Sequence, residues 1–178
     1  CYSEVALRCS SDGRGEFEMF SKALSVEAAL RADEISDQVN TLYIGGGTPS
    51  VLPLSVFSRL LKALDDAGAG GPYEEFTVEV NPEDIVEKGE KYVEGLLRLG
   101  VDRVSMGVQS FDDGILKFMN RRHDAETAKK AYTILEEAGV ENISIDLIFG
   151  LPQLSDAQWQ DTLDKALSIS GTGRLPKH

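Results

Sequence analysis

Thr41-Leu-Tyr-Ile-Gly-Gly-Gly-Thr-Pro-Ser50 is the stretch that decides the fold, because a short β-prone run stops there at three consecutive glycines. Pro53 then stands where the first position of a helix accepts it, and apolar residues recur at helical spacing over 54–64. The same cycle of strand, turn and helix recurs along the chain. It predicts strands over 41–44, 76–80, 103–108 and 142–148, and helices over 16–39, 54–64, 92–99, 112–120, 124–138 and 155–167.

The ends of the predicted helices carry residues that usually cap a helix. Asp124 is a good N-cap, and Ser155 with Gln158 has the spacing of a capping box. Gly100 and Gly139 follow the last apolar residues of their helices. Strands that alternate with helices predict βαβ units, and therefore an α/β fold with a parallel sheet. Right-handed crossovers would place the helices outside a curved sheet or partial (β/α) barrel.

The composition narrows the class of protein. Among 178 residues, 18 basic and 30 acidic side chains give a net charge of −12, which disfavours nucleic acid as a partner. No apolar run approaches the roughly 20 residues that cross a bilayer. Two cysteines, Cys1 and Cys9, are too few for a disulfide scaffold or a thiolate zinc site, and they favour a cytoplasmic setting. We expect a single domain over 1–178 that is truncated at both ends, because it opens at Cys1 rather than at Met.

Polar residues or glycines stand at the end of each predicted strand. The carboxyl ends of parallel strands form one rim, and ligands bind at that rim in parallel α/β folds. We therefore predict a binding site to which all four strands contribute. The residues that would meet there are Gly45, Gly46, Gly47, Thr48, Glu79, Asn81, Gln109 and Asp146.

Each of these residues also has a purely structural interpretation. The run 45–47 suits either a tight turn or a loop whose backbone approaches a ligand closely, but it lacks the GK[ST] ending of a P-loop. Glu79 and Asp146 each stand between two apolar residues, so either carboxylate suits a ligand site or a buried structural hydrogen bond. Arg121 and Arg122 suit solvated cations at a helix end, or one of them suits a ligand carboxylate. We expect His123 to be a surface or cap residue.

Five motifs occur in order and at matching spacing over about 42–167. They are Tyr43-Ile-Gly-Gly-Gly-Thr-Pro-Ser50, Val78-Glu-Val-Asn-Pro-Glu83, Arg103-Val-Ser-Met-Gly-Val-Gln-Ser-Phe111, Asn120-Arg-Arg-His123 and Ile145-Asp-Leu-Ile-Phe-Gly-Leu-Pro152. Together they resemble the radical S-adenosylmethionine (SAM) family that contains oxygen-independent coproporphyrinogen III oxidase and its relative, the heme chaperone.

The resemblance implies a partial (β/α) barrel with a [4Fe–4S] cluster and SAM at the carboxyl rim. One electron from the cluster cleaves SAM into methionine and a 5′-deoxyadenosyl radical, so the chemistry is the cofactor's own and the catalytic residue stays unassigned. The resemblance gives Gly46, Gly47 and Thr48 contacts with the methionyl part of SAM. It gives further cofactor-binding positions to Glu79, to Gln109, to Arg121, which suits a carboxylate, and to Asp146, which suits ribose hydroxyls.

The cysteines depart from the family pattern. The family holds its cluster with three thiolates spaced CxxxCxxC, whereas Cys1 and Cys9 are spaced CxxxxxxxC. By resemblance, Cys1 would be the last cysteine of such a motif and a metal ligand, and Cys9 would be incidental. The chain alone is therefore not expected to assemble a normal cluster or to be catalytically active.

Two functions follow from the resemblance. The oxidase branch decarboxylates propionate side chains of coproporphyrinogen III to vinyl groups, and the chaperone branch binds and delivers heme. The Arg-Arg-His123 ending is closer to the chaperone branch, because oxidases tend to carry Gln in place of the histidine. The implied partners are a porphyrinogen or heme and an electron donor. A barrel fragment that binds another nucleotide is the alternative if the five-motif match is accidental.

Overall fold

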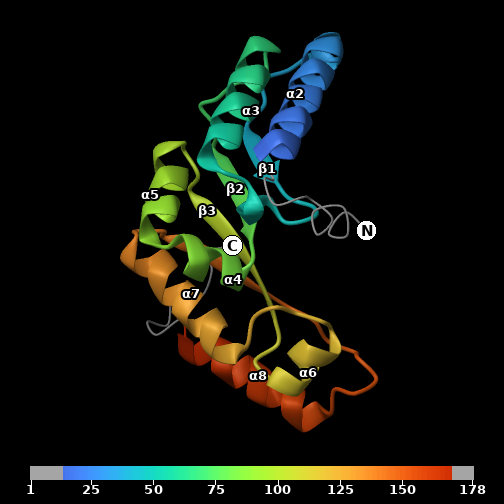
Figure 1. Cartoon of the computed structure of the whole chain (residues 1–178), viewed down its shortest axis with the longest axis vertical. Coiled ribbons are helices and arrows are strands. Elements are labelled where there is room, and N and C mark those ends of the chain that lie inside the picture. The colour runs from blue at the N-terminus through green and yellow to red at the C-terminus, as the bar shows by residue number, and fades with distance from the viewer. Residues whose placement is uncertain (1–13, 170–178) are drawn as a thin grey trace.

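The computed structural model describes residues 14–169 (Figure 1). Four parallel strands form one sheet in the order β1-β2-β3-β4, with each strand paired to the next one along the chain. The strands are β1 (Thr41–Ile44), β2 (Glu75–Val80), β3 (Arg103–Gln109) and β4 (Asn142–Leu147). Helical crossovers join successive strands, which confirms the predicted α/β fold with parallel strands and outer helices.

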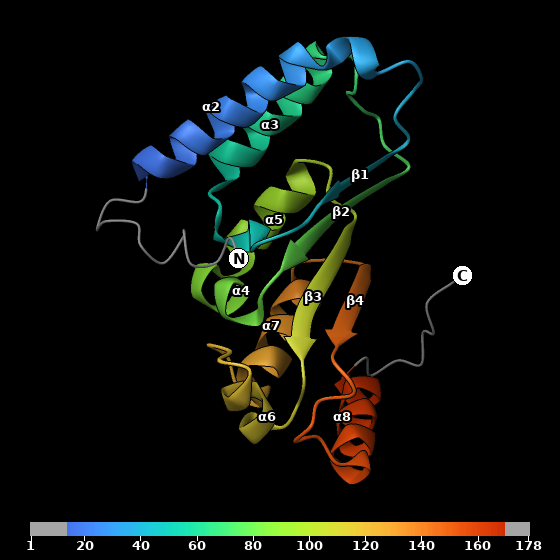
Figure 2. The same ribbon diagram turned by 90° about the vertical axis from the view of Figure 1, so that its right-hand side faces the viewer.

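Helices cover one face of the sheet (Figure 2). Side chains of α3, α4, α5 and α7 join those of the strands in one core, and α2 packs against α3. The arrowheads of β3 and β4 point toward the end of the molecule that carries α6 and α8. The helices are α2 (Arg14–Leu30), α3 (Leu54–Asp66), α4 (Pro82–Lys88), α5 (Glu90–Arg98), α6 (Asp113–Phe118), α7 (Ala125–Glu137) and α8 (Asp156–Ile169), with short 3-10 turns η1 (Ala32–Glu34) and η2 (Pro49–Val51).

The two faces of the sheet differ in polarity because successive side chains of a strand point to opposite sides. Phe76, Val78 and Val80 of β2 are fully buried in the core under the helices. The residues between them face the other way, and the strand register places Glu79 beside Ser105 of β3, which in turn lies beside Ser144 of β4. By the same alternation, the side chains of Tyr43 on β1 and Asp146 on β4 point to this side of the sheet. We call this surface, with Tyr43, Glu79, Ser105, Ser144 and Asp146, the polar face.

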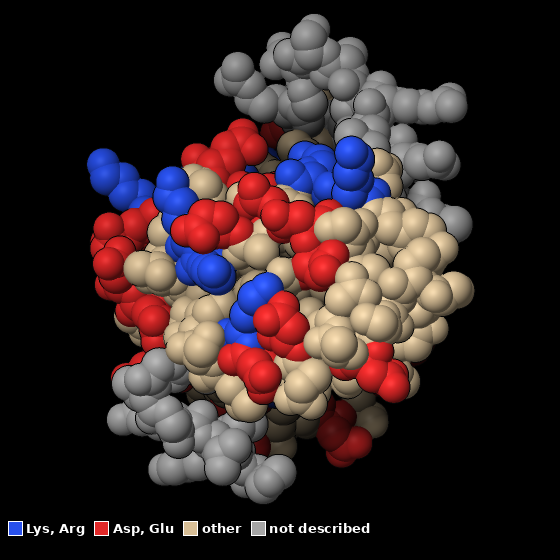
Figure 3. Space-filling model, turned by 90° about the horizontal axis from the view of Figure 1, so that it is seen from below, with Lys and Arg blue, Asp and Glu red and all other residues tan. Residues whose placement is uncertain are grey.

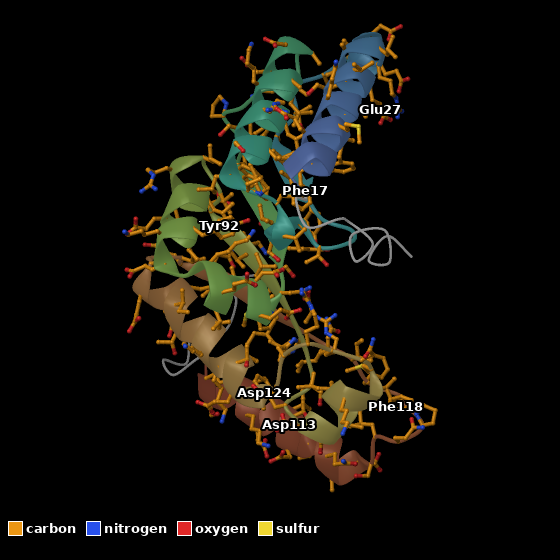
Figure 4. All side chains as sticks on the ribbon, viewed as in Figure 1. Phe17, Glu27, Tyr92, Asp113, Phe118 and Asp124 are labelled. Atoms are coloured by element: carbon orange, nitrogen blue, oxygen red, sulfur yellow. The ribbon has the colours of Figure 1, made fainter. Side chains whose placement is uncertain are left out.

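The predicted helix ends are largely confirmed (Figure 4 labels Asp124 at the start of α7). Asp124 accepts a hydrogen bond from the Thr127 amide at 2.8 Å. The Ser155 amide donates to Gln158 Oε1 at 3.1 Å, and the Gln158 amide donates back to Ser155 Oγ at 3.3 Å. Gly100 and Gly139 have φ values of +96° and +93°, the left-handed conformation that ends a helix.

The structure departs from the predicted helices in three places. The helix α4 was not predicted: Pro82 opens it directly after β2, since proline suits the first turn of a helix. Pro53 is extended, with ψ 153°, and precedes α3 instead of occupying its first position. The helix expected over 16–39 ends at Leu30, and only the short η1 follows before β1.

Within 14–169, no helix combines the length and the apolar character needed to cross a bilayer.

Candidate functional site

The side chain of Glu79 holds the glycine loop that follows β1. The Gly46 amide donates to Glu79 Oε2 at 3.0 Å, and Gly46 has φ +87°, which favours glycine. A Cβ atom on Gly45 would lie 2.4 Å from the Tyr43 ring and 2.8 Å from Glu79 Oε1. A Cβ atom on Gly46 would meet nothing within 4 Å. A side chain at Gly45 would therefore clash with Tyr43 and Glu79, whereas the space beside Gly46 is open.

Glu79 is half-buried and accepts hydrogen bonds from two neutral donors. Tyr43 Oη donates to Glu79 Oε1 at 2.6 Å, and the Gly46 amide binds the other carboxylate oxygen. The hydrogen bond to Glu79, partial burial and the charge of Glu79 together raise the pKa of Tyr43 to about 12. Among the ion pairs of residues 14–169, none includes Glu79. Its charge is thus available to a ligand.

Asp146 is exposed at the end of β4 and is bound in a similar way. Ser105 Oγ donates to Asp146 Oδ2 at 2.8 Å, and Ser105 also faces the Tyr43 hydroxyl. No lysine or arginine of the described chain forms an ion pair with Asp146. The polar face therefore carries two carboxylates that are hydrogen-bonded but not neutralised.

Arg121 brings a cation to the same rim. Its Nη2 donates to Asn81 Oδ1 and to the Gly107 carbonyl, each at 3.0 Å. Its Nε is buried and has no hydrogen-bond partner within the described residues. Both partners of Arg121 are neutral, so its charge and its buried Nε suit a ligand carboxylate.

Thr48 and Gln109 complete the group of predicted residues. Asn81 Nδ2 donates to Thr48 Oγ1 at 3.4 Å, so Asn81 joins the glycine loop to Arg121. Thr48 Oγ1 also donates to the Gly47 carbonyl at 2.7 Å. Gln109 has φ +70° at a register shift between β3 and β4, and its Nε2 would lie 2.9 Å from a Cβ on Gly107. The structure thus brings together the seven predicted cofactor-binding residues, namely Gly46, Gly47, Thr48, Glu79, Gln109, Arg121 and Asp146.

The side chains of Arg122 and His123 contact the first turn of α4, and His123 also contacts β3. Arg122 Nε donates to Glu83 Oε1 at 3.2 Å, and its Nη2 lies 3.4 Å from Asp84 Oδ1. The prediction that His123 is a surface or cap residue is wrong: it is 4% exposed, with Nδ1 3.0 Å from Glu83 Oε2 and Nε2 3.0 Å from the Val108 carbonyl. The pair of acidic residues Glu83 and Asp84 in the first turn of α4 was the sequence signal for these contacts, because buried carboxylates need cationic or hydrogen-bonding partners.

The charge of Glu83 is favoured by these contacts. Burial opposes ionisation of Glu83, but hydrogen bonds from His123 and from its own backbone amide, with the charges of His123 and Arg122, outweigh it. The pKa of Glu83 is therefore lowered. Both ring nitrogens of His123 thus lie within hydrogen-bond distance of oxygens, Glu83 Oε2 and the Val108 carbonyl.

A second buried network fixes the far end of the glycine loop. Ser50 Oγ donates to Asp84 Oδ2 at 2.6 Å and accepts from the Asn81 amide at 3.0 Å. Lys88 donates to the carbonyls of Ser50 and Leu52 and lies 4.3 Å from the centre of the Tyr92 ring on α5 (Figure 4). Burial raises the pKa of Asp84 and lowers the pKa of Lys88. Sequence reasoning did not find this network because it depends on the unpredicted helix α4.

Seen from the end that carries α6 and α8, the described surface has acidic and basic side chains interspersed, without a continuous basic area (Figure 3).

The described residues do not hold a metal site. Within 14–169, no group of three or more His, Cys, Asp or Glu side chains is placed to bind a metal ion. Cys1, the predicted metal ligand, lies outside the described residues, as does Cys9. Since the sequence has two cysteines, it cannot supply three thiolates to a cluster. The residues of the rim fit SAM, and the cysteines of this chain do not fit a complete [4Fe–4S] site.

Curated relatives share most of this chain but are much longer. A heme chaperone HemW of Synechocystis sp. is 35% identical over 159 residues, which cover 86% of this chain and 36% of the relative. A HemW of Lactococcus lactis is 38% identical over 133 residues, covering 75% and 34%. An oxygen-independent coproporphyrinogen III oxidase of Bradyrhizobium diazoefficiens is 32% identical over 153 residues, covering 85% and 33%. The chain thus spans about a third of the length of these relatives.

Solved structures agree with the fold. Coproporphyrinogen III oxidase (HemN) from Escherichia coli, described as a radical SAM enzyme, superimposes with a TM-score of 0.77 at 29% identity, over 90% of this chain and 36% of that one. Archaeal Elp3 from Methanocaldococcus infernus, at 23% identity and a TM-score of 0.61, shares the fold, with 88% of this chain and 40% of that one covered.

The sequence profile of the radical SAM superfamily matches residues 9–166, which is most of the chain. Members of this superfamily use a [4Fe–4S] cluster and SAM, which agrees with the cofactors predicted from the sequence. The chain belongs to the radical SAM superfamily.

Proposed function

We propose that this chain is the SAM-binding core of a radical SAM protein that acts on porphyrinogen or heme. The observation that carries the proposal is the set of charges at the rim that have no ionic partner within the described residues: carboxylates on Glu79 and Asp146, and the guanidinium of Arg121. SAM offers an ammonium group, a sulfonium and a carboxylate, so its charges complement those of the rim.

Each rim residue has a role in this proposal. The open space beside Gly46 admits the methionyl part of SAM, which would lie against the backbone of Gly46 and Gly47. Arg121 binds a carboxylate, Glu79 an ammonium group, and Asp146 the ribose hydroxyls. SAM bound at a reduced cluster supplies a 5′-deoxyadenosyl radical. The chain's own contribution is to orient SAM and to shield it from water.

For the reaction, we propose oxidative decarboxylation of propionate side chains, as in oxygen-independent coproporphyrinogen III oxidase. The solved oxidase with a TM-score of 0.77 supports this choice. A reaction of this type also needs an electron donor as a partner, and we propose a cytoplasmic setting for it.

Heme binding and delivery is the second candidate. It is favoured by the identities of 35% and 38% with heme chaperones, against 32% with an oxidase. His123, the residue that suggested the chaperone branch, contacts only Glu83 and the Val108 carbonyl. His123 therefore joins α4 to β3 in an oxidase and in a chaperone alike, and it does not discriminate between porphyrinogen and heme.

Two assays test the proposal in a longer protein that contains this core together with three cluster cysteines. After anaerobic reconstitution with iron and sulfide, SAM is expected to perturb the visible absorption of the cluster; absence of SAM binding would overturn the proposed function. Formation of vinyl groups from coproporphyrinogen III is then compared with stoichiometric heme binding. Heme binding without decarboxylation would replace the oxidase by the chaperone.

A further inference from the structure

Four polar side chains, one from each strand, form two hydrogen-bonded pairs on the polar face. Tyr43 of β1 donates its hydroxyl to Glu79 of β2 at 2.6 Å. Ser105 of β3 donates to Asp146 of β4 at 2.8 Å. The strand register places Glu79 of β2 beside Ser105 of β3, so the two pairs are neighbours. The two carboxylates are thus each held by one hydroxyl.

The two hydroxyls differ from ordinary structural partners. Tyr43 is 58% exposed, so its ring contributes little to the core, whereas its hydroxyl meets a half-buried carboxylate. Ser105 is buried, and its hydroxyl donates a hydrogen bond to Asp146 rather than to a backbone carbonyl. A carboxylate without a fixed donor rotates freely and binds a ligand with a greater loss of entropy.

The two pairs lie at different ends of the ligand expected here. Glu79 also binds the Gly46 amide, which places it beside the loop that would hold the amino-acid end of SAM. Asp146 stands at the end of β4, two strands away from Glu79 in the sheet. Its neighbours on β3 and β4 are serines, which suit a neutral, hydroxyl-rich group such as ribose.

We propose that Tyr43 and Ser105 are positioning residues with separate tasks: Tyr43 sets Glu79 for the ammonium group of the ligand, and Ser105 sets Asp146 for its ribose hydroxyls. This inference rests on the proposed function, because it takes SAM as the ligand. It adds two residues that have no assigned role and divides the rim into an amino-acid end and a nucleoside end.

Two ligands separate these ends. SAM has both, whereas 5′-methylthioadenosine keeps the ribose and adenine but lacks the amino-acid group. We would titrate the ¹⁵N-labelled chain with each compound and derive the affinities from amide shifts. The variants are Tyr43→Phe, which removes only the hydroxyl, Ser105→Ala, and Tyr73→Phe as a matched control. Tyr73 donates to the Ala69 carbonyl and lines a pocket with Gly71 and Leu99, away from the polar face.

The expected result is a split between the variants. Tyr43→Phe weakens SAM about tenfold and leaves 5′-methylthioadenosine within about twofold of wild type, because it loses a hydrogen bond to a charged group at the amino-acid end. Ser105→Ala weakens both ligands by a similar factor, and Tyr73→Phe weakens neither. In the ligand-free chain, Tyr43→Phe also shifts the Gly46 amide, which shares the Glu79 carboxylate.

The other outcomes discriminate between the inference and the proposed function. If Tyr43→Phe weakens both ligands equally, or weakens neither, while Glu79→Gln still weakens SAM, the inference is wrong and the proposed function stands. Equal effects of Ser105→Ala and Tyr43→Phe on both ligands would likewise remove the division into two ends. If the wild-type chain binds neither ligand, the proposed function fails, and the inference fails with it.

Discussion

The hydroxyl of Tyr43 and the carboxylate of Glu79 form the shortest hydrogen bond of the polar face, at 2.6 Å, and this contact has a measurable signature. The pKa of Tyr43 is raised to about 12 because its hydroxyl donates a hydrogen bond to Glu79, is partly buried, and lies beside the negative charge of that carboxylate. Glu79→Gln removes the charge and should return the pKa toward about 10, the ordinary value of tyrosine. NMR of ¹³C-labelled tyrosine as a function of pH measures it. An unchanged titration of Tyr43 in this variant would show that the two side chains do not interact.

Adjacent arginines provide a second test at the scale of single residues. Arg121 faces the rim with two neutral partners, whereas Arg122 pairs with Glu83 and Asp84 behind it. Arg121→Ala should weaken SAM about tenfold or more, since it removes a charge-assisted contact. Arg122→Ala should leave SAM affinity unchanged and lower the free energy of unfolding by about 1 kcal/mol or less, because Arg122 is largely exposed.

Calorimetric titration and urea unfolding of both variants give the two quantities. The opposite assignment, with Arg122→Ala weakening SAM and Arg121→Ala leaving it unaffected, would contradict this reading of the rim.

Residue type and spacing could not distinguish these arginines, and only the family resemblance assigned the ligand to Arg121. Arg121 and Arg122 stand side by side in one motif, and either was compatible with a ligand carboxylate. The difference arises from their partners, because Asn81 and Gly107 offer neutral acceptors whereas α4 offers two carboxylates. His123 was misjudged for the same reason: its partners come from β3 and α4, far away in the sequence.

At the scale of elements, α4 is the part of the fold that sequence reasoning missed and on which the rim depends. Its first turn binds Arg122 and His123 through Glu83, and Ser50 of the glycine loop through Asp84. A seven-residue helix shows too few turns for a clear apolar period, and Asn81-Pro82 is equally typical of a strand end. The longer elements were predictable because the alternation of strands and the helical period extend over more residues.

The role of α4 predicts a pH-dependent contribution to stability. Because the folded pKa of Glu83 is lowered, its ionised form stabilises the fold above the unfolded value of 4.5, and this contribution is lost as the pH falls through the folded pKa. Glu83→Gln should therefore lower the free energy of unfolding by about 1–3 kcal/mol near pH 7. The deficit should shrink as the pH drops below 4.5.

Urea unfolding at neutral and acidic pH checks this expectation. Glu126→Gln is a suitable control, since Glu126 is exposed and forms only a 3.8 Å contact with Lys129 within α7. A deficit of the Glu83 variant that is the same at both pH values would show that its charge does not matter.

For the whole molecule, the sequence predicts the fold but not the cluster site or the substrate. The α/β fold with parallel strands follows from the sequence pattern, and the superfamily match over 9–166 confirms the family. The cluster does not follow, because the sequence offers only two cysteines. The substrate does not follow either, since the chain spans only about a third of the length of its relatives.

The cysteine count yields a prediction for the whole chain. Reconstituted anaerobically with iron and sulfide, this chain should not develop the stable visible absorption of a [4Fe–4S] cluster, because at least one of the three thiolates is missing. A version extended by a segment with the CxxxCxxC spacing should develop it. Absorption spectra with iron and sulfide analysis measure both, and a stable cluster in the unextended chain would show that other ligands replace the missing thiolates.

Binding of SAM at the carboxyl rim of this sheet is the property on which the proposed function depends. An NMR titration of the ¹⁵N-labelled chain with SAM tests it most directly, because binding to the rim does not require turnover. Saturable shifts confined to the rim are expected, at the amides of Gly46, Gly47, Thr48 and Gln109 and at the side chain of Arg121. Shifts that are absent, or that instead follow the outer helices α2 and α3, would contradict it.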